Sequence, residues 1–360
     1  MFSIDSARQA DACRFCWMCR HICPVGGATG NEGWTPRARG LMMSMIERGT
    51  EYDADIAESM YHCTLCDACA NDCATGYKPS EFIREARTVA VAEDIAPKAI
   101  LKSIDTIAET GNIFGKKVDT AAFGELPEKA EVLLYVGQTA AVSPATAVAA
   151  AKLLKAAGVD FTVLKDEAPS GANMSELMGY TGDVQVMAGK AAEDIAATGA
   201  KKLVVLNPLD AAIFRDQYSA WGLLGGIEVV TATAFVAELL ASGALKVKAA
   251  GISAALQEPV KLTRGLDEIA PAKALLAAAG VELKELFLNG KMSRCVGTVV
   301  LDEYDGVTVK NMVRVRCEDA VRLDIDTIIT ASPDDYYIMS KYATGGVKIL
   351  DIYQILAENC

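Results

Sequence analysis

Two groups of cysteines near the start of the sequence have a spacing that could hold iron and sulfide. Each group reads Cys-x2-Cys-x2-Cys-x3-Cys. Gaps of two residues let three thiolates wrap one face of a cubane core, and a fourth thiolate completes the set. The cysteines are Cys13, Cys16, Cys19 and Cys23 in the first group, and Cys63, Cys66, Cys69 and Cys73 in the second. The spacing therefore predicts two [4Fe–4S] clusters.

The fourth ligand of each cluster is expected to come from the opposite group, as it does in two-cluster ferredoxins. Cluster 1 is thus assigned to Cys13, Cys16, Cys19 and Cys73, and cluster 2 to Cys63, Cys66, Cys69 and Cys23. Structural zinc is the alternative, but zinc sites usually separate two cysteine pairs by a longer loop. One detail departs from the ferredoxin pattern, because Ala74 rather than proline follows the last cysteine.

Other residues near the cysteines are expected to act neither as cluster ligands nor as gates for electrons. Phe15 and Trp17 are expected to exclude water from a cluster. His21 and His62 flank ligand positions, but eight thiolates already fill the eight places, so we expect hydrogen-bond or surface roles for both histidines. The glycines after the first group are expected in a tight loop, because no strand precedes them and no Lys-Ser/Thr pair closes a phosphate loop. They are Gly26, Gly27, Gly30 and Gly33.

Composition narrows the class of protein. The chain has 360 residues, 51% of them hydrophobic, and a formal net charge of −12, which argues against binding to nucleic acid or to an anionic membrane surface. No apolar run reaches the length of a membrane span, and the first residues lack the layout of a signal peptide. Clustered cysteines in an odd total of eleven indicate metal or redox chemistry rather than disulfides. We therefore expect a cytoplasmic protein whose partners are proteins.

The elements that must position these cysteines change in character along the chain. Residues 1–95 are rich in Cys, Met and Arg, with helical patterns at 37–48 and 56–61. Beyond Pro97, apolar runs of strand length alternate with helical patterns, which is typical of parallel α/β units. The expected strands are 132–136, 161–164 and 203–206, and the expected helices are 144–157 and 211–221. The fold class is therefore a mostly helical, ferredoxin-like dicluster domain followed by α/β modules with parallel sheets.

The α/β region contains an internal duplication. The stretch Ala156-Ala157-Gly158-Val159-Asp160 recurs as Ala278-Ala279-Gly280-Val281-Glu282, and the run before Pro208 recurs before Pro333. Several separated features keep nearly the same offset, which favours two related modules over a chance match of Ala-rich helices. The predicted domains are a dicluster domain at 1–95, a first α/β module at 96–245 and a second at 246–360.

The run Cys23-Pro24-Val25…Ala28-Thr29-Gly30-Asn31-Glu32…Pro36-Arg37…Gly40 resembles the iron–sulfur subunits of glycolate oxidase, anaerobic glycerol-3-phosphate dehydrogenase and heterodisulfide reductase. In that family two ferredoxin motifs precede two α/β modules. Each module carries a Cys-Cys-Gly element and further cysteines that assemble a cluster or metal site. The resemblance extends across the chain and implies the same order of parts here.

The modules depart from the family by losing nearly all of those cysteines. In the first module the family positions fall on Gly137-Gln138, Pro169-Ser170-Gly171 and Asn207-Pro208-Leu209-Asp210. In the second they fall on Val260, Cys295-Val296-Gly297 and Ser332-Pro333-Asp334-Asp335. Only Cys295 survives, while Cys317 and Cys360 are isolated and expected to be unligated. The losses argue against a cluster in either module.

Acidic residues at these positions have two interpretations. Asp210, Asp334 and Asp335 could offer oxygen ligands to magnesium or calcium. An Asp after a strand and a proline is also a common helix start, so the preferred interpretation is helix capping.

The resemblance implies an electron-transfer subunit with no catalytic residues of its own. A partner flavoprotein, an FAD-linked dehydrogenase acting on a 2-hydroxy acid or related metabolite, would deliver single electrons to the two clusters. A second carrier would remove them, and the cysteine-poor modules would serve as a docking scaffold in a hetero-oligomer. Two alternatives stay open: a catalytic subunit like that of heterodisulfide reductase, which needs module thiolates, and a redox-sensing scaffold.

Overall fold

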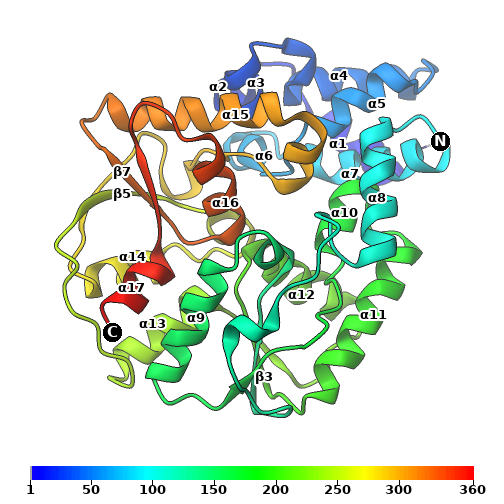
Figure 1. The fold of residues 1–360 in the computed structure, drawn as a ribbon. Coiled ribbons are helices and arrows are strands. Elements are labelled where there is room, and N and C mark those ends of the chain that lie inside the picture. Colours follow the sequence, from blue (N-terminus) through cyan, green and yellow to red (C-terminus); the bar gives the residue numbers. More distant parts are fainter. Residues whose placement is uncertain (1) are drawn as a thin grey trace.

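The computed structural model describes residues 2–360, and its first part is helical (Figure 1). Two of these helices, α4 and α5, confirm the helical patterns expected at 37–48 and 56–61. The elements of this region are α1 (Ile4–Ala12), α2 (Met18–Ile22), α3 (Pro24–Thr29), η1 (Glu32–Trp34), α4 (Pro36–Glu47), α5 (Ala54–Tyr61), α6 (Ala68–Asp72) and α7 (Pro79–Ala92). Helix α8 (Lys98–Thr110) then leads to the modules.

Local sequence explains where these helices begin. Helix α4 has Pro36 in its first turn, and the Thr35 hydroxyl accepts a hydrogen bond from the Ala38 N–H. Helix α5 starts after Asp53, whose carboxylate accepts from the Ile56 N–H at 2.9 Å. Such caps satisfy N–H groups that have no partner inside the helix. Short helices with firm starts hold the cysteine loops between them.

The first α/β module is a four-stranded parallel sheet with the order β2-β1-β3-β4. Its strands are β1 (Val132–Tyr135), β2 (Phe161–Thr162), β3 (Lys202–Val205) and β4 (Glu228–Thr231). The accompanying helices are η2 (Thr120–Phe123), η3 (Gln138–Ala141), α9 (Ala145–Ala156), α10 (Ala172–Met178), α11 (Gly182–Ala197), α12 (Pro208–Ala220) and α13 (Ala232–Ala241). The predicted alternation of strand and helix is confirmed.

The second module repeats this arrangement with the order β6-β5-β7-β8, again all parallel. Its strands are β5 (Ser253–Gln257), β6 (Glu282–Lys284), β7 (Thr327–Thr330) and β8 (Lys348–Asp351). Its helices are η4 (Lys261–Gly265), α14 (Ala270–Ala278), η5 (Gly290–Met292), α15 (Val299–Val321), α16 (Pro333–Tyr342) and α17 (Ile352–Glu358). The matching strand orders agree with the duplication inferred from the sequence.

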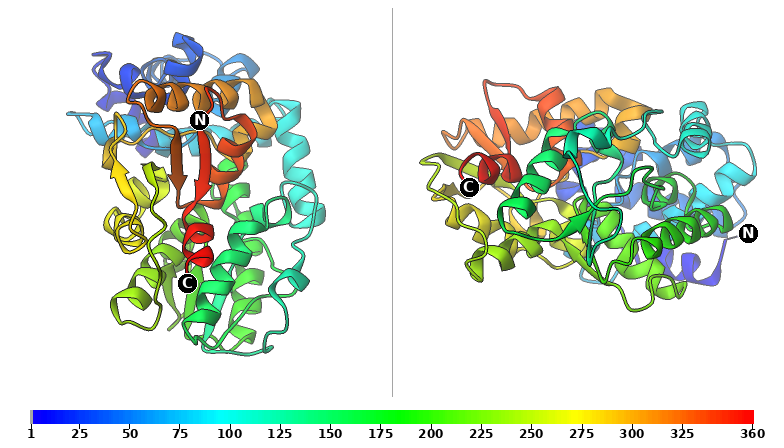
Figure 2. Two further views of the ribbon diagram at one scale, coloured as in Figure 1. Left: turned by 60° about the vertical axis from the view of Figure 1, so that its left-hand side comes forward. Right: turned by 60° about the horizontal axis from the view of Figure 1, so that its bottom comes forward.

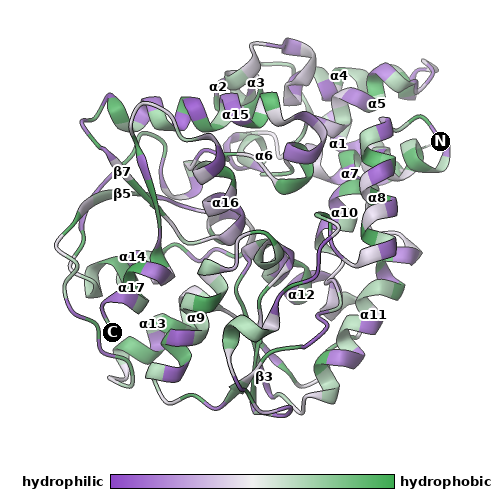
Figure 3. Cartoon of the chain, viewed as in Figure 1, coloured by the Kyte–Doolittle hydropathy of each residue, from purple (hydrophilic) through white to green (hydrophobic). Residues whose placement is uncertain are grey.

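The last helix of each module packs against the other module. Helix α13 of the first module packs against α14 of the second, and α17 of the second packs against α9 of the first. One apolar core contains side chains of both sheets, and Figure 3 shows α13 and α14 as mostly hydrophobic. The division at residues 245 and 246 stays a prediction, since the core runs across it.

The helical region lies across one end of the two modules (Figure 2). Helix α15 contacts α3, and α7 contacts α10 of the first module. Helix α15 is kinked at Asp305, whose backbone has φ −142° and ψ 75°. Within residues 2–360, no helix is both long enough and apolar enough to cross a membrane.

Candidate iron–sulfur site

The structure brings the eight N-terminal cysteines into two groups of four. In one group, burial is the main reason that the pKa values of Cys13 and Cys19 are raised; charge on Cys16 and Cys73 adds to the shift of both, and charge on Cys23 adds to that of Cys19. In the other, the same effect links Cys23 to Cys63 and Cys66, and Cys69 to all three. A cavity is lined by Cys23, Cys63, Cys66 and Cys69 together. These groups agree with the crossed ligand sets, although the ligand assignment itself stays a prediction.

The two cysteine loops share an uncommon backbone conformation. Phe15 and Trp17 have φ values of 52° and 74°, and the equivalent residues Leu65 and Asp67 have 48° and 56°. Left-handed backbone at a residue other than glycine costs about 1–3 kcal/mol and concentrates at functional sites. In both loops the second residue after the first cysteine, Phe15 or Leu65, donates its N–H to that cysteine sulfur at 3.4 Å. Successive N–H groups facing one point form a concavity for an anion.

The cysteine side chains of the two groups are better suited to bind an iron–sulfur core than to remain free thiols. Burial raises the pKa of Cys13, that of Cys19 to about 12 and that of Cys23 to about 11, so free thiols at these three positions keep their protons. Iron binds thiolates and compensates their charge, which removes this penalty. A cubane also spaces its four thiolates more widely than a single ion does, because each thiolate binds a different iron. Within residues 2–360, no three His, Cys, Asp or Glu side chains are placed to hold one metal ion.

The two groups differ in exposure. In the first group Cys16 is exposed, Cys19 and Cys73 are half-buried and Cys13 is buried, whereas in the second group Cys63 is half-buried and Cys23, Cys66 and Cys69 are buried. Trp17 beside Cys16 is 45% exposed, and its indole lies under the guanidinium groups of Arg37 and Arg20, at 4.6 and 5.2 Å. The site of cluster 1 therefore opens to solvent, and the expected water-excluding role of Trp17 is only partial there.

The second cysteine loop is held by side chains distant in sequence. Lys261 Nζ donates to the Leu65 carbonyl at 3.2 Å, and Arg264 Nε donates to the Cys66 carbonyl at 2.6 Å. From α7, Arg87 Nη2 donates to the Cys63 carbonyl at 2.5 Å. The second module thus contributes directly to the cluster 2 site. Sequence reasoning missed these residues, because no spacing signal links them to the cysteines.

Cys295, the one cysteine kept at a family position, reaches the second cysteine loop. Its thiol lies beside Cys66, and this contact lowers the pKa of Cys66 although burial opposes that shift. The Cys295 S–H itself donates to the Gly297 carbonyl at 3.4 Å. Cys317 is buried in the core of the second module, and Cys360 is exposed near the end of the chain.

The two histidines lie outside the two cysteine groups. His21 is exposed. His62 is buried, with Nδ1 3.0 Å from the Glu58 carbonyl oxygen and Nε2 3.3 Å from an Asp305 carboxylate oxygen. Burial lowers the pKa of His62. Both imidazole nitrogens therefore have partners, and His62 joins α5 to the kink of α15.

In the first module, the family's cysteine positions converge without thiols. Ser170 Oγ donates to an Asp210 carboxylate oxygen at 2.5 Å. A Cβ added to Gly137 would lie 2.8 Å from the other Asp210 oxygen, so the three positions surround one point. In the second module, the corresponding Val260, Gly297, Ser332, Asp334 and Asp335 line one small cavity. The positions assigned from the sequence therefore lie close together within each module.

The capping prediction for the acidic residues is wrong in its detail. The capping side chains are Asn207, which accepts from the Leu209 N–H at 3.0 Å, and Ser332, which accepts from the Asp335 N–H at 3.5 Å. Asp210, Asp334 and Asp335 instead lie in the first turns of α12 and α16. Because proline occupies the first helical position, the residue before it becomes the cap.

Comparisons with known proteins agree with this site. Residues 9–77 match the 4Fe-4S dicluster domain family. This region is therefore a 4Fe–4S dicluster domain, and its eight cysteines are consistent with two [4Fe–4S] clusters.

Three curated relatives cover much of the chain. A probable membrane-anchored ferredoxin of Chromohalobacter salexigens is 27% identical over 67% of this chain and 38% of its own length. The probable iron-sulfur-binding oxidoreductase FadF of Bacillus subtilis is 22% identical over 99% and 61%. An EtfAB:quinone oxidoreductase of Syntrophomonas wolfei is 22% identical over 92% and 51%. The chain thus spans between 38% and 61% of the length of these relatives.

One solved structure with partial likeness is glutamate racemase isoform RacE1 from Bacillus anthracis. The match covers 64% of this chain and 80% of the racemase, with 15% identity and a TM-score of 0.32. A likeness of that size supports no conclusion about this chain.

Proposed function

We propose that this dicluster protein is an electron-relay subunit that passes single electrons between a flavoprotein dehydrogenase and a second redox carrier. The observation that carries the proposal is the unequal exposure of two adjacent thiol groups. Cys16 of the first group is exposed, whereas Cys66 of the second is buried beneath the second module. A relay needs one cluster that exchanges electrons at the surface and one that stores or forwards them inside.

Two clusters suit a flavin partner, because a reduced flavin gives up two electrons and each cubane accepts one. The proposed donor is an FAD-linked dehydrogenase for a 2-hydroxy acid or related metabolite, in a cytoplasmic hetero-oligomer. Support for a redox complex comes from relatives named as an iron-sulfur-binding oxidoreductase and an EtfAB:quinone oxidoreductase. The cysteine-poor modules would form the docking scaffold of that complex.

The chemistry of the modules favours relay over disulfide reduction. A reductase of the heterodisulfide type needs several thiolates in the modules, and the family positions of the first module hold Gly137, Ser170 and Asp210. The second module keeps only Cys295 at such a position. No arrangement of these side chains supplies the ligands of a third cluster.

The test is to purify the protein without oxygen and to measure iron, sulfide and electron uptake. We expect about eight irons and eight sulfides per chain, two electrons per chain on titration with dithionite, and an EPR spectrum of two interacting cubanes. With photoreduced FAD as donor and cytochrome c as acceptor, the protein should speed electron transfer, and Cys16→Ala should abolish that effect. Four irons, or an additional EPR signal on adding a disulfide, would overturn the relay.

A further inference from the structure

Buried acidic side chains from both modules meet where the modules face each other. Glu176, Asp210 and Asp334 are at most 8% exposed, and Asp335 is partly buried beside Asp334. We call these four residues the carboxylate interface. Isolated carboxylates are costly to bury.

Hydrogen bonds and ion pairs connect this interface across the modules. The Thr139 hydroxyl of the first module donates to an Asp334 carboxylate oxygen of the second. Lys261 Nζ lies 3.2 Å from Glu176 Oε1 and also donates to the Leu65 carbonyl of the second cysteine loop. The network therefore extends from the first module to the loop that carries the predicted ligands of cluster 2.

A small cavity lies within the carboxylate interface. It has a volume of about 30 Å³ and is lined by Glu176, Asp334 and Asp335 among others. A cavity of about 10–15 Å³ suffices for one water molecule when polar partners are present. Glu176 Oε1 accepts no hydrogen bond despite its ion pair with Lys261, so an acceptor is left open in this cavity.

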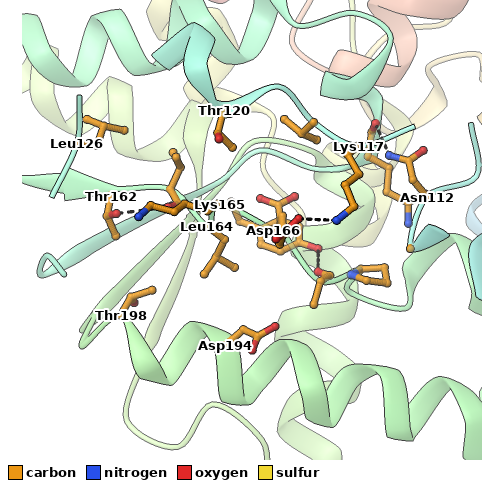
Figure 4. Close-up of a pocket in the computed structure, with 18 of the residues that line it drawn as sticks. Asn112, Lys117, Thr120, Leu126, Thr162, Leu164, Lys165, Asp166, Asp194 and Thr198 are labelled. Carbon is orange, nitrogen blue, oxygen red and sulfur yellow. Dashed lines mark hydrogen bonds and ion pairs between the residues drawn. The ribbon is translucent and has the colours of Figure 1, made fainter. Parts of the chain in front are cut away.

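A second, larger cavity lies in the first module and reaches Glu167, which is close enough to Asp210 for the two carboxyl groups to affect each other. It has a volume of about 630 Å³ and lies beside β2, with the Lys117–Asp166 ion pair across it (Figure 4). Glu167 lines this cavity and accepts hydrogen bonds from the N–H groups of Val136 and Gly137, both at 2.8 Å. Since Gly137 also abuts Asp210, Glu167 and Asp210 flank the same short segment.

We propose that the carboxylate interface takes up one proton from solvent when cluster 2 accepts one electron. This inference rests on the proposed function. The electron comes from the reduced flavoprotein and stays on the cluster, while the proton arrives by way of Glu167 and Asp210 and forms an O–H bond with Asp334 or Asp335. Protonation offsets the negative charge added by the electron, which buried surroundings screen poorly.

Burial of the carboxyl groups favours proton exchange near neutral pH. Burial raises the pKa of Asp210 and of Asp335 to about 7, and that of Glu167 to about 8. The charged and titratable groups that face the interface are Glu167, Lys261, Arg87, Arg316, Cys295, Tyr135 and Tyr218. Arg316 lowers the pKa of Asp335, and the negative charge of Asp334 raises it.

The test is an EPR redox titration of the cluster-loaded protein between pH 6 and pH 9. One midpoint potential should fall as the pH rises, by at most about 59 mV per pH unit for one proton and one electron. The double variant Asp334→Asn, Asp335→Asn should lose this slope and keep a potential near the acidic value of the parent protein. Asp324→Asn removes one exposed carboxylate in a turn and should keep the parent slope.

Each outcome separates this inference from the relay. If the midpoint potentials of the parent protein do not depend on pH, proton uptake is overturned and the relay stays intact. The same holds if the double variant keeps the slope of the parent protein. Absence of iron in the parent protein would instead overturn the relay. If the double variant does not fold, infrared difference spectra of the parent protein decide the question: a carboxyl C=O band that appears on reduction and shifts in D₂O supports uptake, and its absence refutes it.

Discussion

Arg87 is joined to Cys63 by a hydrogen bond of 2.5 Å from its guanidinium to the cysteine carbonyl. The same guanidinium donates to the Met60 carbonyl at 2.8 Å and to the Glu176 carbonyl, and the Arg87 side chain is buried. The Arg87 guanidinium therefore holds the start of the second cysteine loop in place. It also holds the contact of this loop with the first module. Four backbone carbonyl groups accept from it, because the Tyr61 carbonyl does so as well, at 3.5 Å.

Replacement of Arg87 by methionine should destabilise the protein strongly. Methionine keeps part of the apolar stem but leaves those carbonyls unsatisfied, at about 1–3 kcal/mol each. We expect a loss of about 3–5 kcal/mol in the free energy of unfolding, measured by urea titration without oxygen, together with weaker retention of cluster 2. Arg48→Met, at an exposed position, is the matched control and should change stability by less than about 0.5 kcal/mol.

The crossed ligand assignment predicts different iron contents for two fourfold alanine variants. Replacing Cys23, Cys63, Cys66 and Cys69 removes every ligand of cluster 2 and should leave four irons in cluster 1. Replacing Cys63, Cys66, Cys69 and Cys73 removes the fourth ligand of cluster 1 as well. That second variant should hold fewer than four irons. If it retained an intact cubane, ligation would be local to each motif.

Gly137 should tolerate alanine poorly for two separable reasons. Its φ is +80°, and an added Cβ would lie 2.8 Å from Asp210 Oδ2. Gly158 also has a positive φ, +69°, but nothing lies within 4 Å of its added Cβ. Gly158→Ala should therefore cost about 1 kcal/mol from backbone strain alone, and Gly137→Ala about 1–3 kcal/mol more from the clash. Equal losses in thermal unfolding would refute the close packing of Gly137 on Asp210.

Stability should fall as the pH rises from about 5 to about 7, partly through Asp351. Burial raises the pKa of Asp351 to about 7, above its ordinary value of about 3.9, so the folded state binds this proton more tightly than the unfolded state. Deprotonation above the unfolded pKa then favours unfolding. Asp351 also caps α17 by accepting from the Gln354 N–H, a role that asparagine performs equally well.

The variant Asp351→Asn isolates that contribution. Between pH 5 and pH 7 it should lose roughly 2 kcal/mol less stability than the parent protein, since each pH unit is worth about 1.4 kcal/mol per proton. Urea unfolding at several pH values measures the difference. Parallel stability curves for the two proteins would contradict a raised pKa at Asp351.

Local signals in the sequence predicted the parts of the fold that depend on short spacing. The repeated cysteine pattern and the strand-helix alternation each lie within a few residues, and the structure has the predicted strands and the repeated sheet order. The caps Asn207 and Ser332 could also have been found, because each precedes a proline. Contacts such as Arg264 to Cys66 join residues 198 positions apart, and no periodicity or spacing reports them.

The last helices of the two modules have a consequence for the origin of the chain. Because α13 packs on α14 and α17 packs on α9, each module completes the other in the same way. This is the isologous contact of a symmetric homodimer, in which one surface serves both partners. The chain is therefore built like a dimer of a single-module ancestor whose two copies became fused. A protease cut in the loop around residues 243–250 should leave two fragments that stay associated through these helices.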